Sequence, residues 1–210
     1  MLQLHQQRSI AKDFKLPLST NDAYLLLYSA YQVEVQRVGK VLKKDEATTN
    51  VIAKVANWLT NKSGNDFGMM FCGMCGNGKS TLLRAIQNSF NWLRNNAKFS
   101  IDEMNAGYDK VPIYEAKKIV TDYESRERYY NNVAILGIDD LGNEPTEILM
   151  FGQPFNPICD LLESRYNDRL ITFVTTNLTP KELRVKYGAR IIDRMNETMK
   201  IVVFSHDTYR

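Results

Sequence analysis

The feature that most constrains this chain is a glycine-rich turn, Gly73-Met74-Cys75-Gly76-Asn77-Gly78-Lys79-Ser80. It fits the pattern G-x-x-x-x-G-K-[ST] at every fixed position. The stretch 67–72 before it reads as a short buried strand, and a helical pattern opens at Thr81 and continues to about Asn96. In this context the backbone N–H groups of the turn and the helix N-terminus form a cage for phosphate oxygens. The turn therefore predicts a P-loop nucleotide-binding fold.

The predicted loop gives each kind of residue in it a role. The glycines let the main chain approach the phosphates closely and take positive φ angles. Lys79 is expected to reach the β- and γ-phosphates, and the Ser80 hydroxyl is expected to bind Mg2+. The nucleotide-binding residues that we expect are Gly73, Met74, Cys75, Gly76, Asn77, Gly78, Lys79, Ser80 and Thr81.

Two adjacent acids, Asp139 and Asp140, close an apolar run that begins at Val133. We expect Asp139 to hold Mg2+ through water, opposite Ser80, and Asp140 to polarise the water that attacks the terminal phosphate. Two acids at a strand end can also simply cap the next turn. The phosphate loop upstream favours the catalytic interpretation.

Further polar groups complete the predicted site. Asn177 follows the expected strand 170–176, and ligands sit at the carboxyl ends of strands in such sheets, so its amide could contact the γ-phosphate or the attacking water. The alternative is a turn-forming asparagine. Arg190 and Arg194 are four residues apart and share one helix face. They form either a solvated surface or a pair that projects to a neighbouring subunit's nucleotide, where an arginine stabilises the transferring phosphoryl group.

Strands and helices alternate along the rest of the chain. The expected strands are 67–72, 111–114, 133–139, 170–176 and 200–204, and the expected helices are 22–41, 49–59, 81–96, 156–167, 179–187 and 190–199. The third strand is almost continuously apolar, which is typical of a strand covered on both faces. The pattern predicts an α/β fold in which helices cover both faces of a parallel sheet.

Composition limits the number of domains and the class of protein, but it does not indicate a function. The chain has 210 residues, of which 44% are hydrophobic and 24% are charged, with a net charge of +3, and this suits one α/β domain with a small appendage. Without a signal-like N-terminus or a long apolar run, we expect a cytoplasmic protein with no membrane contact. Cys72 and Cys75 form a C-x-x-C, but there is no second pair to complete a zinc site, so we interpret the spacing as accidental.

Taken together, the motifs resemble the DnaC/DnaI helicase loaders and their relative IstB, within the AAA+ ATPases. The resemblance covers about residue 48 to the C-terminus. It is carried, in chain order, by Gly73 to Ser80; Ile138-Asp139-Asp140-Leu141-Gly142 with Glu144; Asn156-Pro157-Ile158 leading to Glu163-Ser164-Arg165-Tyr166; Thr175-Thr176-Asn177-Leu178; Tyr187-Gly188 through Asp193-Arg194-Met195; and Thr208-Tyr209-Arg210.

The resemblance implies a three-layer αβα P-loop NTPase with an AAA+ core and a parallel five-stranded sheet in the order 5-1-4-3-2. It implies an N-terminal helical extension, 1–47, before an ATPase domain, 48–210, with no C-terminal helical lid after the last strand. The implied activity is ATP hydrolysis with Mg2+ at composite sites between self-associated subunits. The implied partners are a replicative helicase and single-stranded DNA.

By matching position, the resemblance makes Asn177 the sensor-1 residue and Arg194 the arginine finger, with Arg190 as its alternative. Arg165 becomes a third candidate for a contact across the interface. Most AAA+ enzymes carry Glu where Asp140 stands here. The shorter side chain argues against rapid turnover, and Glu144 could share its role.

Two regions keep two interpretations each. The stretch 116–132 mixes basic residues with tyrosines, which suits either a groove for single-stranded nucleic acid or an amphipathic helix whose tyrosines pack on the sheet. The helix 22–41 carries an apolar stripe that includes Tyr24, Leu27 and Tyr31. That stripe is either a partner-binding face or, as we favour, a surface packed on the ATPase core.

The leading functional hypothesis is a DnaC-like ATPase that loads or remodels a DNA helicase, using ATP binding and slow hydrolysis as a timer. An IstB-type transposition helper would act on duplex DNA instead. A nucleotide-gated adaptor without hydrolysis is a third possibility, which the aspartate at position 140 keeps open. A small-molecule kinase is disfavoured, because such enzymes need an arginine-rich acceptor lid for which we expect no room after the last strand.

Overall fold

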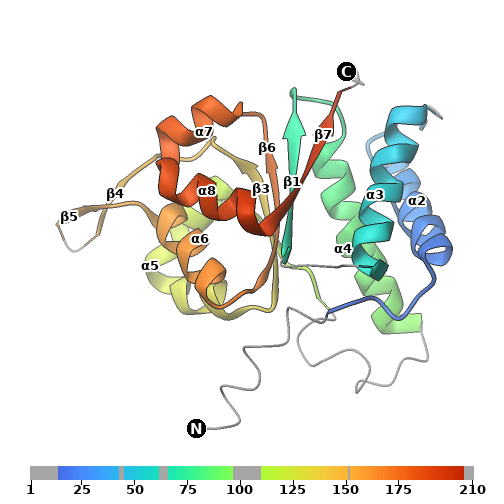
Figure 1. Ribbon diagram of the computed structural model, residues 1–210, viewed down its shortest axis with the longest axis horizontal. Coiled ribbons are helices and arrows are strands. Elements are labelled where there is room, and N and C mark those ends of the chain that lie inside the picture. The colour runs from blue at the N-terminus through green and yellow to red at the C-terminus, as the bar shows by residue number, and fades with distance from the viewer. Residues whose placement is uncertain (1–13, 43–44, 62–65, 97–109, 151, 206–210) are drawn as a thin grey trace, which may run out of the picture.

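The computed structural model describes residues 14–42, 45–61, 66–96, 110–150 and 152–205, and in them a five-stranded sheet is covered by helices on both faces (Figure 1). The strands of this sheet are β1 (Gly68–Gly73), β2 (Ile113–Glu115), β3 (Ile135–Leu141), β6 (Ile171–Thr176) and β7 (Met199–Phe204). The helices are α2 (Thr20–Arg37), α3 (Glu46–Asn61), α4 (Lys79–Asn96), α5 (Ala116–Asn132), α6 (Pro157–Asn167), α7 (Pro180–Tyr187) and α8 (Ala189–Thr198). Within the described residues, no helix is both long and apolar enough to cross a lipid bilayer.

The sheet is parallel throughout, and its strands lie in the order β2-β3-β6-β1-β7. Counted along the chain among the strands of this sheet alone, that order is the predicted 5-1-4-3-2. The labels run differently because a separate two-stranded hairpin contributes β4 and β5. The predicted three-layer α/β fold is confirmed. One consequence is central to the site: β1 and β3 are not neighbours, because β6 lies between them.

Two apolar cores fill the space between the sheet and its helical layers. One lies under α2, α3 and α4, and the other lies under α5, α6, α7 and α8, which Figure 1 shows on the opposite side of the sheet. Phe71 and Phe173 stack on the first side, with their ring centroids 6.5 Å apart. Burial on both faces explains why β1, β3 and β6 read as apolar runs rather than as alternating strands.

Helix α2 packs on the core, as favoured from its stripe. Ser19 caps its N-terminus through a hydrogen bond from the Asp22 N–H, 3.1 Å long. Leu27 and Tyr31 are buried in the same cluster as residues of α3 and α4. The helix ends at Arg37, earlier than predicted, and Val38 is exposed. The boundary at residue 47 stays a prediction, although the described part of the extension shares one core with the following helices.

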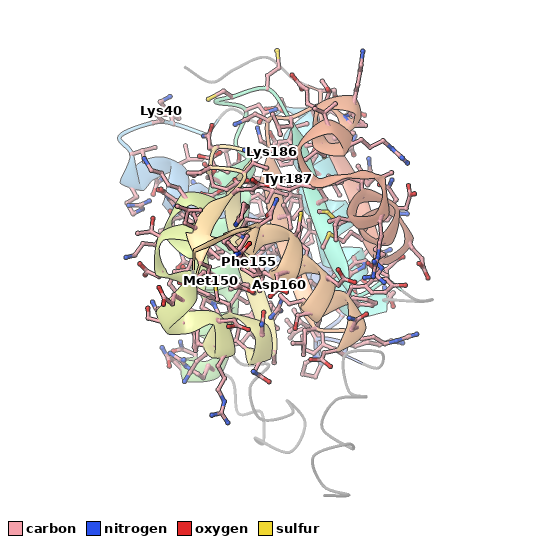
Figure 2. The ribbon with its side chains drawn as sticks, turned by 90° about the vertical axis from the view of Figure 1, so that its left-hand side faces the viewer. Lys40, Met150, Phe155, Asp160, Lys186 and Tyr187 are labelled. Carbon is pink, nitrogen blue, oxygen red and sulfur yellow. The ribbon has the colours of Figure 1, made fainter. Side chains whose placement is uncertain are left out.

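The hairpin β4 (Ile148–Met150) and β5 (Gln153–Phe155) was not predicted. Its strands are too short to show an alternating pattern, and a proline inside β5 argues against a strand. Figure 1 shows the hairpin projecting beyond α5 and α6, and Figure 2 shows Phe155 at its base beside Asp160 of α6. The ring of Phe155 packs on Tyr123, 5.9 Å away, and the Tyr123 hydroxyl donates to Asp160 over 2.8 Å.

Helix α5 uses its tyrosines mainly for packing. Tyr123 and Tyr130 are fully buried against the sheet, while Tyr129 is partly exposed. The Arg126 guanidinium lies 5.0 to 5.4 Å from the ring centroids of Tyr114, Tyr129 and Tyr130. Of the two interpretations of this stretch, packing on the sheet therefore accounts for its buried tyrosines.

The prediction that Arg165 contacts a neighbouring subunit is wrong. Arg165 lies inside the molecule, 1% exposed. It donates to the carbonyl oxygens of Tyr130, Val133 and Ile171 and to the Thr172 hydroxyl, over 2.7 to 2.9 Å. These acceptors come from the C-terminal end of α5, the link to β3 and the start of β6. The arginine thus joins three segments that the sequence separates.

We predict that Arg165→Met lowers the free energy of unfolding by about 3–5 kcal/mol, because it leaves several buried carbonyl oxygens without donors. Urea denaturation followed by circular dichroism measures the change. Arg128→Met, at an exposed position of α5, is the matched control and should shift stability by less than about 0.5 kcal/mol. Equal stability of the two variants would contradict the structural role.

Candidate nucleotide-binding site

The phosphate loop lies where predicted, between the end of β1 and the start of α4. Three of its glycines have positive φ angles: 147° at Gly73, 85° at Gly76 and 95° at Gly78. Gly73 has a second constraint, since a Cβ there would lie 2.5 Å from Asn77 Nδ2 and 2.6 Å from the Phe204 carbonyl oxygen. Both conditions exclude a side chain, so the glycines are needed for the shape of the loop.

Lys79 is the buried cation of the loop. Its Nζ donates to the carbonyl oxygens of Gly73 (2.8 Å) and Met74 (2.6 Å) and to Asn77 Oδ1 (3.0 Å). Burial lowers the pKa of the Lys79 ammonium, and neighbouring acidic groups oppose that shift. Asn77, itself buried, donates from Nδ2 to the Phe204 carbonyl oxygen over 3.1 Å and so anchors the loop to β7. The ammonium is thus positioned at the centre of the loop by oxygen acceptors.

The predicted magnesium residues meet directly. Ser80 Oγ, at the start of the helix that follows β1, donates to Asp139 Oδ1 over 2.8 Å, although β6 separates β1 from β3. Thr175 of the intervening strand donates from Oγ1 to the same carboxylate oxygen over 2.6 Å. A hydroxyl beside a carboxylate at this corner fits Mg2+, which prefers oxygen ligands and keeps several waters. The described residues contain no group of three or more His, Cys, Asp or Glu that could hold a metal ion.

Asp140 turns away from Asp139 through a left-handed backbone, with φ at 55°. Its N–H donates to Thr175 Oγ1 over 2.8 Å, which fixes this conformation. Asn177 Nδ2 donates to Asp140 Oδ1 over 3.5 Å. Burial, followed by the charge of Asp139, raises the pKa of the Asp140 carboxyl. The two residues proposed to handle water therefore face the same space.

A cavity of about 610 Å³ connects these groups. One wall is polar and contains Asp140, Asn177 and the loop residues Cys75, Gly76 and Gly78 to Thr81. The other wall is mainly apolar and comes from the end of α2 and the residues after it: Tyr31, Val35, Val38, Lys40, Val41 and Leu42. Sequence reasoning missed this second wall, because an apolar helical stripe reads as core packing. Figure 2 labels Lys40 at the edge of this region.

The two candidate arginine fingers are not in this cavity. Arg190 and Arg194 lie on α8, and both contact the Glu163 carboxylate of α6, with Arg194 Nη1 2.6 Å from Oε1. The Arg194 guanidinium also stacks over the Tyr166 ring, 4.7 Å from its centroid. Arg190 is mostly exposed, and Arg194 is about one-quarter exposed. Both guanidinium groups are therefore accessible at the surface, although both pair with the Glu163 carboxylate.

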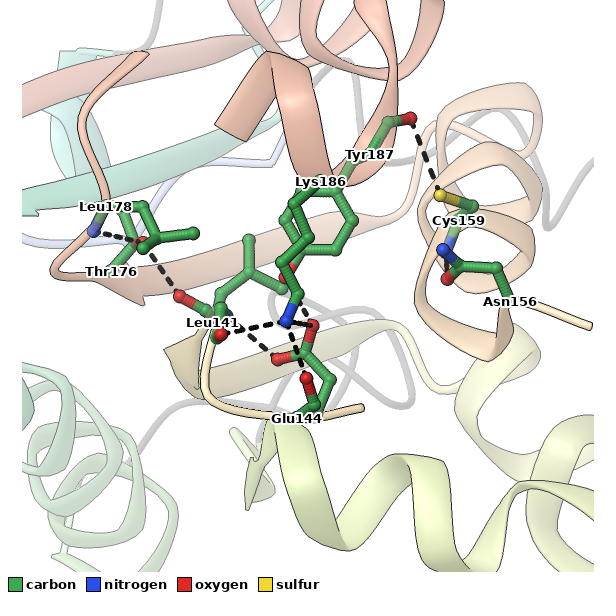
Figure 3. Close-up of polar contacts among 9 residues, drawn as sticks. Leu141, Glu144, Asn156, Cys159, Thr176, Leu178, Lys186 and Tyr187 are labelled. Carbon is green, nitrogen blue, oxygen red and sulfur yellow. Dashed lines mark hydrogen bonds and ion pairs between the residues drawn. The ribbon is translucent and has the colours of Figure 1, made fainter. Parts of the chain in front are cut away.

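Glu144 does not share the role of Asp140, contrary to expectation. Its carboxylate is fully buried, accepts from the Gly142 N–H over 2.8 Å and the Tyr187 hydroxyl, and pairs with Lys186 at 3.4 Å (Figure 3). Lys186 Nζ also donates to the carbonyl oxygens of Gly142 and Glu144. Figure 3 shows these side chains reaching from α7 to the turn after β3. Glu144 therefore fixes that turn to α7.

We predict that Cys75 reacts with N-ethylmaleimide far faster than the other cysteines and that ATP with Mg2+ protects it. Cys75 is exposed and lines the cavity, whereas burial raises the pKa of both Cys72 and Cys159 to about 11. At pH 8 such a thiol is about one part in a thousand thiolate. Mass spectrometry of labelled peptides measures each rate, and Cys75→Ser is the control. Unchanged labelling at saturating nucleotide would contradict occupancy of the loop.

We compared the chain with family models, curated proteins and solved structures. No family model matches the chain, and no curated protein matches it. Among solved structures, the DnaC helicase loader superposes with a TM-score of 0.57 at 17% identity, covering 77% of this chain and 92% of that one. DnaI gives 0.58 at 19% identity, covering 82% and 89%. AMPPCP-bound DnaA from Aquifex aeolicus gives 0.53 at 17% identity, covering 79% of this chain and 49% of that one.

These identities show the fold alone, and the resemblance expected from the motifs is confirmed at that level. The chain has the fold of the DnaC, DnaI and DnaA structures.

Proposed function

We propose that this protein is a cytoplasmic, DnaC-like ATPase that acts in DNA replication by loading or remodelling a replicative helicase on single-stranded DNA. The observation that carries the nucleotide part of the proposal is the 2.8 Å contact between Ser80 Oγ and Asp139 Oδ1, at one end of a loop centred on Lys79. The replication part is supported by the likeness of the fold to a helicase loader and to DnaI.

In the proposed complex, the phosphates of ATP lie in the loop. Their oxygens replace the Gly73 and Met74 carbonyl oxygens as acceptors of the hydrogen bonds that Lys79 Nζ donates. Ser80 contributes a hydroxyl ligand to Mg2+, and Asp139 accepts hydrogen bonds from its waters. The nucleoside lies between the loop and the apolar wall that ends α2. Bound Mg2+ supplies charge neutralisation at the β- and γ-phosphates.

Hydrolysis is assigned to Asp140 and Asn177, which face one space at 3.5 Å from each other. The raised pKa of Asp140 makes its carboxylate a better proton acceptor than an ordinary aspartate, so it can polarise a water. Its single methylene limits its reach, which fits slow turnover. Binding without turnover would instead favour the nucleotide-gated adaptor.

The proposed active form is an assembly in which one subunit's α8 arginine reaches a neighbour's phosphates. Arg194 is the first candidate and Arg190 the second, because both keep access to the surface. For either to extend, it must leave Glu163, and a phosphate oxygen can replace that carboxylate as the acceptor. Self-association would thus complete the site.

We predict that Lys79→Ala weakens binding of a fluorescent ATP analogue by about 10- to 100-fold, because it removes a charge-assisted contact to the phosphates. Lys54→Ala, at an exposed position on α3, is the matched control and should bind like the wild type. Fluorescence titration with Mg2+ measures the affinity. Wild-type protein that shows no binding would remove the nucleotide proposal altogether.

We predict that Arg194→Ala loses hydrolysis by about 10³-fold without losing nucleotide affinity. Mixing it with Lys79→Ala should restore phosphate release, because the Arg194→Ala pocket can receive an intact arginine from the Lys79→Ala subunit. Absence of rescue at any mixing ratio would exclude Arg194, and Arg190→Ala is then the variant to mix.

Single-stranded DNA and a cognate replicative helicase should each raise wild-type turnover if the loader proposal holds. Preferential stimulation and binding by duplex DNA would point to the transposition helper. ATP-dependent partner binding with no phosphate release would point to the adaptor.

A further inference from the structure

A second carboxylate, Glu115, lies at the end of the edge strand β2, beside the predicted magnesium site of Ser80 and Asp139. In the parallel register between β2 and β3, Glu115 is opposite Asp139, and Ile113 is opposite Gly137. Neighbouring strands lie about 4.8 Å apart, and residues directly opposite each other in register share a face of the sheet. Glu115 and Asp139 are therefore adjacent positions on one face.

The face they share is the one that α4 covers. A Cβ built on Gly137 would lie 2.8 Å from Ile113 Cγ1 and 3.3 Å from Leu83 Cδ1 of α4. Tyr114, between Ile113 and Glu115, points to the opposite face, where its ring packs on Tyr130 of α5 at 5.2 Å. Alternation thus puts Glu115 on the side where Ser80 meets Asp139.

Glu115 and Asp139 open onto one polar cavity of about 420 Å³, whose other walls include Arg84 and Gln87 of α4. Glu115 occupies the N-cap position of α5, yet its side chain accepts no capping hydrogen bond from that helix. Among the described residues it has no hydrogen-bond or ion-pair partner, and it is exposed to the cavity. Its charge also contributes to raising the pKa of Asp140, after burial and Asp139.

We propose that Glu115 is a positioning residue of the magnesium site, which accepts a hydrogen bond from a water of the bound ion alongside Asp139. This inference rests on the proposed nucleotide site. Asp139 Oδ1 already accepts two hydroxyl groups, from Ser80 and Thr175, so it has limited capacity for the hydration shell of Mg2+. Glu115 is one methylene longer than Asp139 and reaches toward the same waters from the edge of the sheet. An octahedral ion that keeps several waters needs such outer acceptors.

The decisive experiment is a MgCl2 titration of binding of mant-AMPPNP, a slowly hydrolysed fluorescent ATP analogue. Glu115→Gln should need about tenfold more Mg2+ for half-maximal binding, as is usual when an outer-shell partner of a metal is removed. Its affinity for the analogue in EDTA should equal that of the wild type, which a misfolded variant would not show. Glu115→Asp keeps the charge and should recover part of the loss.

Glu124→Gln, at an exposed position on α5, is the matched control and should titrate like the wild type. A Glu115→Gln titration that coincides with this control would overturn the assignment while leaving the nucleotide site intact. An unchanged Mg2+ requirement with slower hydrolysis would also overturn it, in favour of contact with the attacking water. Wild-type protein that binds no analogue at any Mg2+ concentration would remove both this inference and the proposed function.

Discussion

The hydrogen bond between the Ser80 hydroxyl and the Asp139 carboxylate joins two parts of the chain that no local interaction could bring together. This hydrogen bond spans the end of β6, and Thr175 of that strand donates to the same carboxylate oxygen. The start of α4 and the ends of β6 and β3 are therefore fixed with respect to one another by a single acceptor. The proposed metal site, built from the helix that follows β1 and from the ends of β6 and β3, requires the β1-β6-β3 order, so its chemistry depends on the topology.

A second set of contacts extends from that corner toward α7. Leu178, after β6, packs against Gly142, where a Cβ would lie 2.5 Å from Leu178 Cδ1; the φ of 110° at Gly142 also disfavours a side chain. Glu144 and Lys186 then tie the same turn to α7 through buried polar contacts. Buried charged groups of this kind are costly unless fully paired, and here each has several partners. The turn that follows Asp140 is thus held by Leu178 and by α7.

Much of this site could be predicted because its signals are local. The phosphate loop is a contiguous motif, and Asp139, Asp140 and Asn177 end strands whose carboxyl ends meet at one edge of a parallel sheet. Charged residues away from the motifs were harder to place. Arg165 and Glu144 both read as functional, but their acceptors and donors come from distant segments, so only the fold shows that they are structural.

The missed features share a different cause. The hairpin β4–β5 pairs only three residues on each strand, too few for a periodic signal. Glu115 stands alone in the sequence, and only the strand register brings it to Asp139. The wall formed by Val35 and Val38 belongs to a stripe that also packs on the core, and sequence periodicity does not separate lining a cavity from filling one.

That wall bears on how this protein would select its nucleotide. Residues 35–42 supply most of the apolar surface opposite the phosphate loop. In the proposed complex, these residues would cover the base of the nucleotide while the loop holds its phosphates. Substitutions in this wall would then alter the discrimination among purine and pyrimidine triphosphates before they altered phosphate binding. Because α2 also packs on the core with α3 and α4, the proposed base contact would be coupled to that packing.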